Sequence, residues 1–308
     1  MLKKPNVRII TIVGPTAVGK TGLAMSLAKK ISGEIISADS RQVYKYLDIG
    51  TAKPSITDRK EVVFHLIDFV DPQDTYSSGQ FARDAEICIS EILRKNRTPI
   101  VCGGTGLYIR ALFNPFHPLP HANKEIRNRL LNILAKKGLE YLYQKLQRID
   151  PAWAKRINPH DRQRILRGLE VYEITRRPLS KLIQSSPKKA KFLPYYIGLN
   201  LPRTILYQRI NQRFDQMIKN GLIQEIKLLL KKGFSPQSNA LKTIGYKEII
   251  QYLHGELSLE QATARAKQRT RNFARRQITW FNSIPGLKWY NPQDKKIIEL
   301  IIKKLRLD

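Results

Sequence analysis

Residues 14–21 read Gly14-Pro-Thr-Ala-Val-Gly19-Lys20-Thr21 and follow directly on an apolar run at residues 7–13. A strand ending in G-x-x-x-x-G-K-T turns through its glycines, so that backbone N–H groups and the start of the next helix point at one anionic group. Lys20 adds a mobile cation, and the Thr21 hydroxyl can ligate Mg²⁺ held by the same oxygens. The stretch predicts a P-loop for a phosphate-bearing ligand, either a nucleoside triphosphate or another diphosphate.

The charge of the chain indicates a polyanionic partner. Its 308 residues contain 55 Lys and Arg against 25 Asp and Glu, for a formal net charge of +30, and the pI is about 10.2. Such a chain attracts nucleic acid in a salt-dependent manner. A generally basic host proteome or a codon bias toward Lys is the alternative explanation for the lysines. The hydrophobic fraction of 42% excludes a disordered chain, and the length favours two domains.

Cysteine content and hydropathy indicate a cytoplasmic protein. Cys88 and Cys102 are the two cysteines, so neither a disulfide framework nor a Cys-based zinc site is expected. The apolar run near the N-terminus is too short for a signal peptide and leads into the phosphate loop. No stretch of the sequence is long and apolar enough to cross a bilayer, so no membrane association is expected.

The first part of the chain alternates between strand and helix patterns, which is typical of a parallel sheet with helical crossovers. Strand patterns cover residues 7–13, 34–37, 63–70 and 99–102, and helix patterns cover residues 20–31, 78–95 and 105–112. Three prolines within residues 114–120 exclude both helix and ladder, and we interpret this run as a hinge.

A helical block then interrupts the α/β pattern. Residues 121–181 carry apolar side chains at helical spacing, including Ile126, Leu130, Leu134, Leu139, Leu142 and Leu146. A Lys-rich linker at 185–193, a strand at 195–201, and helices at 202–232 and 258–282 complete the chain. The predicted fold is therefore α/β, a P-loop NTPase-like parallel sheet flanked by helices, with an inserted all-helical domain. The expected division is 1–115 and 193–308 for the core and 116–192 for the insert.

Two aspartates lie at or just beyond the ends of predicted strands, at the sheet edge where open parallel sheets bind ligands. Asp39 follows the second strand, where its carboxylate can accept a proton or ligate Mg²⁺ through water. A helix or turn cap is an equally good explanation. Asp68 ends another predicted strand and is a weaker candidate for the metal, because the neighbouring Asp71 and Pro72 indicate a plain turn.

Glycines and arginines elsewhere suggest further ligand contacts. Gly103-Gly104-Thr105 ends the fourth strand and allows close backbone approach to a ligand, although a simple turn with Thr105 as N-cap explains it too. Arg209 and Arg213 lie one helical turn apart and share a face, which suits charge developing on a departing diphosphate.

Two basic clusters predict a nucleic-acid surface. One follows the last long helix in two stripes beside a seam of Ala262, Ala266, Phe273 and Trp280, and the other lies in the helical block. The cations are Arg265, Lys267, Arg269, Arg271, Arg275 and Arg276 in the first cluster, and Arg162, Arg164, Arg167, Arg176 and Arg177 in the second. A merely solvated helix would mix charge signs, so a phosphate backbone is the favoured partner.

Taken together, these motifs resemble the tRNA dimethylallyltransferase (isopentenyltransferase) family of bacterial type. The resemblance runs in order over essentially the whole chain. The matching motifs are Gly14 to Thr21, Asp39-Ser-Arg-Gln42, Gly103-Gly-Thr105, Arg162-Gln-Arg164-Ile-Leu-Arg167, Gly245-Tyr246 and Arg276-Gln-Ile-Thr-Trp280. The Cys/His zinc module of eukaryotic relatives is absent.

The resemblance implies transfer of a dimethylallyl group from dimethylallyl diphosphate to N6 of the adenosine 3′-adjacent to the anticodon, with release of pyrophosphate. It implies Asp39 as the base, with Lys20, Thr21, Arg213 and Thr105 as further catalytic residues and Mg²⁺ at Thr21. The implied diphosphate contacts are Gly14, Pro15, Thr16, Ala17, Val18, Gly19, Lys20, Thr21 and Arg209. The implied contacts to the tRNA anticodon stem-loop are Asp39, Ser40, Arg41, Gln42, Gln163, Arg164, Ile165, Leu166, Arg167, Lys242, Arg275 and Arg276. A monomer is expected.

Two other functions fit part of the sequence. A P-loop small-molecule kinase using ATP explains residues 14–21 but not the excess of positive charge. A non-catalytic RNA-binding module, in which the phosphate loop only grips the RNA backbone, explains the charge but predicts no product. A comparison of ATP binding with dimethylallyl diphosphate binding distinguishes the kinase from the transferase. The effect of replacing Asp39 distinguishes the RNA-binding module from the transferase.

Overall fold

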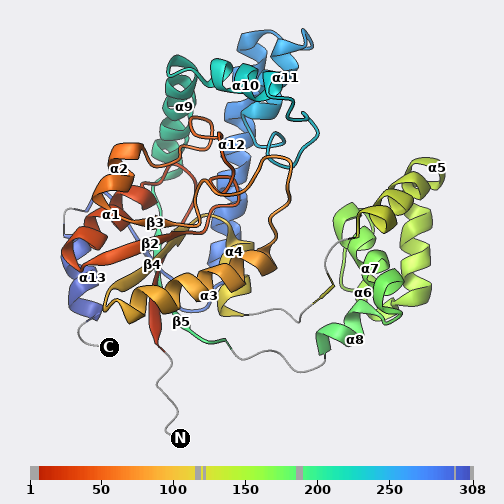
Figure 1. The fold of residues 1–308 in the computed structure, drawn as a ribbon, viewed down its shortest axis with the longest axis horizontal. Coiled ribbons are helices and arrows are strands. Elements are labelled where there is room, and N and C mark those ends of the chain that lie inside the picture. The colour runs from red at the N-terminus through yellow and green to blue at the C-terminus, as the bar shows by residue number, and fades with distance from the viewer. Residues whose placement is uncertain (1–6, 115–118, 121–122, 185–189, 295, 306–308) are drawn as a thin grey trace, which may run out of the picture. The chain divides into compact units, whose positions relative to one another are not determined.

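A computed structural model of the protein describes residues 7–114, 119–120, 123–184, 190–294 and 296–305. Their strands form one parallel six-stranded sheet in the order β3-β2-β4-β1-β5-β6 (Figure 1). The bounds are β1 Arg8–Val13, β2 Gly33–Ser37, β3 Phe64–His65, β4 Thr98–Gly103, β5 Leu193–Leu199 and β6 Lys288–Tyr290. The predicted parallel α/β fold is confirmed.

The chain divides into two compact units, Met1–Phe113 with Ala190–Asp308, and Asn114–Lys189. The first unit holds the sheet and nine of the described helices. These are α1 Lys20–Lys30, α2 Ile56–Glu61, α3 Ser78–Arg94, α4 Gly106–Phe113, α9 Arg203–Lys219, α10 Leu222–Lys231, α11 Tyr246–Leu253, α12 Leu259–Asn282 and α13 Ile297–Leu305. Capping boxes fix several of the starts, among them Ser77 with Gln80 at α3 and Ser258 with Gln261 at α12.

Alternating side chains of the strands build a core on each face of the sheet. Ile10 and Ile12 of β1 pack with α1, α9 and α13 on one face. Ile9 and Val13 pack with α3 and α4 on the other. Both faces of the central strands are buried, as expected for a parallel sheet whose crossovers are helical. The carboxyl ends of β1, β2, β4 and β5 therefore meet at one edge, and the loops that follow them form the candidate site.

The predicted strand at residues 63–70 is wrong in length, because β3 contains only Phe64 and His65. Leu66 (φ 57°) and Asp68 (φ 62°) adopt left-handed backbone conformations, which cannot continue an extended strand. Asp68 instead ion-pairs with Lys53 at 2.8 Å and Arg59 at 3.3 Å. Its carboxylate therefore stabilises this loop through two ion pairs.

The C-terminal part of the chain is more divided than expected. The predicted helix at 202–232 is two helices, because Gly221 (φ 100°) ends the α-helical path between α9 and α10. The predicted strand at 195–201 starts and ends two residues earlier, as β5. The short elements α2, α11, β6 and α13 were not predicted from the sequence. The hinge expected at 114–120 and the linker expected at 185–193 lie largely outside the described residues.

A third core lies beyond the carboxyl edge of the sheet, where α9 to α12 pack together (Figure 1). The Glu225 carboxylate of α10 accepts hydrogen bonds from three successive backbone N–H groups in the loop after β2. These come from Asp48 at 3.0 Å, Ile49 at 2.8 Å and Gly50 at 3.3 Å. The Tyr246 hydroxyl also donates to Glu225, at 2.5 Å. The C-terminal helices therefore brace the loop that carries Asp39.

The second unit is helical, with α5 Lys124–Ile149, α6 Pro151–Ala154, α7 Arg162–Thr175 and α8 Leu179–Gln184. Its core contains the leucines and isoleucine picked out by their spacing, with Leu130, Leu142 and Leu146 fully buried. Gly138 (φ 79°) kinks α5. Glu170, 1% exposed, accepts from Arg127 and Arg167, each at 2.9 Å. Burial of this carboxylate is offset by the two guanidinium groups.

None of the helices in the described part of the chain combines the length and apolar character that a bilayer crossing requires. Cys88 and Cys102 are both free thiols. Burial raises the pKa of Cys102, in β4, to about 12, so this thiol stays protonated at neutral pH.

Candidate active site

The loop from Gly14 to Gly19 joins β1 to α1 and depends on its glycines. A Cβ on Gly14 would lie 2.4 Å from the carbonyl oxygen of Leu199 in β5, so a larger residue would separate β1 from its neighbour. Gly19 has a φ of 106° at the start of α1, a conformation that favours glycine. The loop is thus shaped to present backbone N–H groups and the positive end of α1 to an anion.

Lys20 reaches back over the loop. Its Nζ donates to the carbonyl oxygens of Gly14 at 3.0 Å and Pro15 at 2.8 Å. Burial lowers the pKa of this ammonium group to about 8, while Asp39 raises it and Arg213 lowers it further. A lysine with this pKa is mostly protonated at pH 7 and becomes mostly neutral above about pH 8.

We predict that binding of an alkyl diphosphate weakens as the pH rises through about 8. The pKa of Lys20 is lowered in the free protein, so the cation is present below that value and is lost above it. With one proton coupled to binding, Kd should rise by up to roughly tenfold per pH unit above the free pKa. Calorimetric titration between pH 7 and 10 measures this, since the phosphate groups are already ionised there.

Lys20→Met is the matched control for that titration. The variant should bind the diphosphate more weakly at pH 7 and show a shallower pH dependence. A wild-type affinity that is constant from pH 7 to 10 would contradict the assignment of Lys20 as the titrating cation.

Two arginines of α9 lie beside the phosphate loop. Arg213 donates a hydrogen bond through Nη2 to the Thr16 hydroxyl. A Cβ on Gly19 would lie 4.0 Å from Nη1 of Arg209, which places that guanidinium at the other end of the loop. Burial lowers the pKa of Arg213, and the charge of Asp39 opposes this. The predicted arginine pair and Lys20 are therefore brought together around the loop.

Asp39 lies where the sequence analysis predicts, just beyond the end of β2. Its Oδ1 accepts from the backbone N–H of Arg41 at 2.8 Å and, more weakly, of Gln42 at 3.4 Å. The capping interpretation is thus correct, and it fixes the carboxylate near Lys20 and Arg213, whose pKa values respond to its charge. Capping and proton transfer are compatible uses of two carboxylate oxygens.

The loop between β4 and α4 is tied to the loop after β2. Thr105 Oγ1 accepts from the backbone N–H of Ser40 at 3.0 Å, and Thr105 N donates to the Ala38 carbonyl at 3.1 Å. A Cβ on Gly103 would lie 2.1 Å from that same carbonyl. Glycine at 103 therefore permits the close approach of the two loops, and Thr105 lies beside the residue that follows Asp39.

Gln277 lies within the Arg276-Gln-Ile-Thr-Trp280 motif, but no role is predicted for it from the sequence. Its buried side-chain amide accepts from Thr16 N at 2.8 Å and donates to the Gly104 carbonyl at 2.9 Å. It therefore connects the phosphate loop with the loop that carries Thr105. A polar residue on the apolar seam of α12 was the signal that could have identified it.

Two residues predicted to contact tRNA also support the loop after β2. The Gln42 amide donates to the carbonyls of Thr51 at 3.2 Å and Ala52 at 3.0 Å. Arg41 donates to the Asn239 carbonyl at 2.6 Å. Both side chains are partly exposed.

The basic face of α12 is narrower than expected. Lys267 ion-pairs with Asp215 of α9 at 2.6 Å, and Arg269 ion-pairs with buried Glu248 of α11. The segment of α12 from Arg265 to Arg276 contains no acid, but acids of α9 and α11 pair with two of its cations. The expectation that all six cations face a polyanion needs correction. The exposed cations of this helix include Arg265, Arg275 and Arg276, and Lys242 before α11 is also exposed.

The four residues of the predicted seam of α12 differ in burial. Ala262 and Ala266 are buried as expected, but Phe273 and Trp280 are only partly buried. The remaining buried positions of the helix are Ala274, Gln277 and Phe281. Trp280 packs against Gly106, where a Cβ would lie 2.2 Å from the indole nitrogen.

The predicted stretch in the helical unit lies at the start of α7. Gln163 and Arg164 are exposed. Arg167 is held by Glu170 and by the Pro120 carbonyl at 2.7 Å. Ile165 and Leu166 belong to the core of this unit, so their side chains support the helix and do not face solvent.

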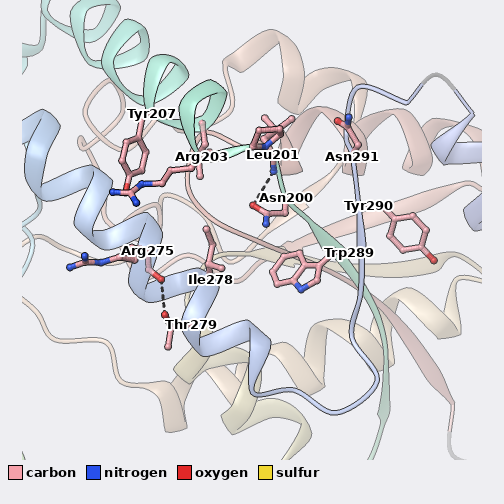
Figure 2. A pocket seen from close by; sticks show the side chains of 12 residues that line it. Asn200, Leu201, Arg203, Tyr207, Arg275, Ile278, Thr279, Trp289, Tyr290 and Asn291 are labelled. Atoms are coloured by element: carbon pink, nitrogen blue, oxygen red, sulfur yellow. Dashed lines mark hydrogen bonds between the residues drawn. The ribbon is translucent and has the colours of Figure 1, made fainter.

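A cavity of about 580 Å³ adjoins the carboxyl ends of β5 and β6 (Figure 2). Its walls include Leu201, Ile278 and Trp289, together with the cations Arg203 and Arg275. Arg203 lies 5.1 Å from the ring centre of Tyr207. The volume of the cavity suits a small molecule. Its lining, however, does not include Asp39, Lys20, Thr105 or Arg213. We therefore place the chemistry at the loops that follow β1, β2 and β4.

The donor set limits how a metal ion could bind. The described residues include no group of three His, Cys, Asp or Glu side chains able to hold a metal together. The Thr21 hydroxyl, in the first turn of α1, remains the predicted ligand. This fits Mg²⁺, which commonly takes few protein ligands and is completed by substrate phosphates and water.

The sheet order and the phosphate loop define a P-loop-like α/β protein. Comparison with known proteins narrows this class. A family model described as "IPP transferase" matches residues 42–284, and one described as "Isopentenyl transferase" matches residues 7–65. The chain belongs to the IPP transferase family.

Individual relatives agree with this assignment. The tRNA dimethylallyltransferase of Carboxydothermus hydrogenoformans is 46% identical over 97% of this chain and 96% of its own. The crystal structure of the tRNA isopentenylpyrophosphate transferase of Bacillus halodurans is similar with a TM-score of 0.71, 38% identity and 97% coverage of both chains. A eukaryotic dimethylallyltransferase acting on tRNA is similar with a TM-score of 0.82 and 30% identity, over 97% of this chain and 78% of that one.

Proposed function

We propose that this protein transfers a dimethylallyl group from dimethylallyl diphosphate to N6 of the adenosine 3′-adjacent to the anticodon of tRNA, releasing pyrophosphate. The observation that carries the proposal is the meeting of a phosphate loop, two arginines and a carboxylate at one sheet edge. Near full-length relatives named tRNA dimethylallyltransferase support it.

The acceptor half of the reaction requires a base. The lone pair of an adenine amino group is delocalised into the ring, so the nitrogen attacks well only if its proton is removed as the N6–C1 bond forms. Asp39 accepts that proton through the oxygen that is not capping the turn. Thr105 and the neighbouring loop residues hold the base that has been pulled from the anticodon loop, which costs a few kcal/mol of stacking.

The donor half of the reaction requires cations. As the C1–O bond breaks, negative charge develops on the departing pyrophosphate, and prearranged donors stabilise it. Lys20, Arg213, Arg209 and the loop N–H groups supply them. Thr21 would hold Mg²⁺, which adds positive charge at the same phosphate oxygens.

Both units of the chain contribute cations for RNA. The exposed residues proposed to contact the anticodon stem-loop are Arg275, Arg276 and Lys242 in the first unit, and Arg164 with the neutral Gln163 in the second. Arg167 acts there through its ion pair with Glu170, a carboxylate that also pairs with Arg127 of α5 and so connects α5 with α7. We propose a cytoplasmic monomer.

We predict that the affinity for an anticodon stem-loop falls steeply with salt, because each phosphate contact releases counterions. The slope of log K against log salt should be about −0.7 to −0.9 per contact. Arg275→Gln and Arg276→Gln should each reduce the slope by about one contact. Arg94→Gln, at an exposed arginine of α3, is the matched control and should leave it unchanged. A flat salt response of the wild-type protein contradicts a basic RNA surface.

The direct test is mass analysis of nucleosides from tRNA incubated with the protein, Mg²⁺ and dimethylallyl diphosphate. The proposal expects adenosine carrying one added dimethylallyl group, only when the diphosphate is supplied. Formation of ADP and a phosphorylated acceptor would support a kinase instead. Tight tRNA binding without any product would support an RNA-binding module.

A further inference from the structure

Gln277 is an exception on the buried side of α12. The other buried residues of this helix are alanines and a phenylalanine, whereas Gln277 is polar and 6% exposed. A buried amide is costly unless both of its ends find hydrogen-bond partners. The partners of Gln277 therefore indicate why the position is polar.

Both ends of the amide are used, on two different loops. Oε1 accepts from Thr16 N at 2.8 Å in the phosphate loop, and Nε2 donates to the Gly104 carbonyl at 2.9 Å in the loop after β4. β1 and β4 are adjacent strands, with Val13 paired to Gly103. One side chain thus spans the two loops just where their strands end.

The contact with Gly104 leaves no room for a side chain at position 104 unless the Gln277 amide moves. A Cβ at Gly104 would lie 2.3 Å from Gln277 Nε2. The positive-φ residues do not include Gly104, so its backbone alone would tolerate alanine. The absence of a side chain at 104 therefore serves the approach of Gln277.

The two loops hold the two halves of the proposed chemistry. Thr16 accepts the hydrogen bond of Arg213 on the leaving-group side. Gly104 precedes Thr105, which binds the N–H of Ser40 beside Asp39. We propose that Gln277 is a positioning residue that sets the spacing between the diphosphate and the attacking adenine. This inference rests on the proposed function and names how its two half-sites are aligned.

Gln277 also lies directly after Arg275 and Arg276, which are exposed on the same helix. The surface proposed to bind RNA and the amide that joins the loops are thus parts of one rigid element. Alignment of two reactants affects the rate of the bound complex more than the affinity for either one. The signature of Gln277 should therefore lie in the rate at saturation.

The first experiment compares Gln277→Met with wild type in single turnovers at saturating dimethylallyl diphosphate and tRNA. Methionine keeps the length of the side chain and removes both hydrogen bonds. We expect the saturated rate to fall at least about tenfold, with less than about threefold change in Kd for the tRNA stem-loop and for the diphosphate. Gln268→Met, at an exposed glutamine of the same helix, is the matched control and should behave as wild type.

Gly104→Ala tests the same contact from the other side, and thermal unfolding of all variants separates misfolding from misalignment. In the wild-type background the added methyl group displaces the amide and should lower the saturated rate. In the Gln277→Ala background the space is free, so the same change should have little further effect. Additive losses from two independent sites would overturn the proposal.

The outcomes also separate this inference from the proposed function. If the wild-type protein modifies no tRNA, the proposed function itself fails. If wild type transfers the group and Gln277→Met does so at the same saturated rate, or loses only affinity, Gln277 is a structural residue and the positioning role is wrong.

Discussion

Asp39→Asn is expected to slow dimethylallyl transfer by about 10²–10⁴ while leaving the affinity for tRNA close to that of wild type. Asparagine keeps an oxygen that can accept from Arg41 N, so the turn held by the 2.8 Å hydrogen bond survives. It cannot take up the N6 proton, and the amino group must then attack with that proton in place. Single-turnover transfer and equilibrium tRNA binding measure the two effects separately.

Asp71→Asn is the matched control for this experiment. Asp71 caps a similar turn, with Oδ1 accepting from Gln73 N at 2.9 Å, but has no proposed part in the chemistry. It should transfer at the wild-type rate. Near-normal turnover of Asp39→Asn would remove Asp39 from the role of base. Unchanged tRNA binding by Asp39→Ala, in a protein that forms no product, would support the RNA-binding alternative.

Arg213→Gln is expected to lower the transfer rate by on the order of 10²–10³. The guanidinium donates a hydrogen bond to the Thr16 hydroxyl in the phosphate loop, where the departing pyrophosphate would bind. Removing it leaves the charge that develops in the transition state without one of its prearranged cations. Burial lowers the pKa of Arg213, so this cation is held at an energetic cost.

Arg203→Gln is the matched control, because Arg203 lies on the same helix but packs against Tyr207 and lines the cavity. Its transfer rate should equal that of wild type. Arg213→Lys should recover part of the lost rate, since it restores charge without the planar donor set. If Arg213→Gln reduced only the affinity for tRNA, the arginine would belong to RNA binding and not to the leaving-group site.

Local patterns predict the phosphate loop and Asp39 well, for physical reasons. The loop conformation is dictated by glycines within eight residues, and the strand before it is marked by its apolar run. Asp39 is identified because the carboxyl ends of parallel strands meet at one edge. The arginine pair follows from helical spacing alone. Each of these signals is contained in a short window of sequence.

Other features depend on partners that are distant along the chain. Gln277 is a polar residue on a helical seam until Thr16 and Gly104 are seen on either side of its amide. Lys267 and Arg269 look like free cations until Asp215 and Glu248 are found opposite them. β3 is shorter than predicted because residues such as Leu66 adopt a left-handed backbone conformation. A leucine side chain gives no indication of that conformation in the sequence.

The pairing of β1 with β5 has a consequence for how the protein is made. The Leu199 carbonyl that fits against Gly14 belongs to a strand translated long after the phosphate loop, with the whole helical unit in between. Contacts of such long sequence separation form late, because a large loop must first be closed. A nascent chain on the ribosome should therefore be unable to bind a diphosphate until β5 has emerged. The phosphate loop is translated early, but it should be one of the last parts of the site to become functional.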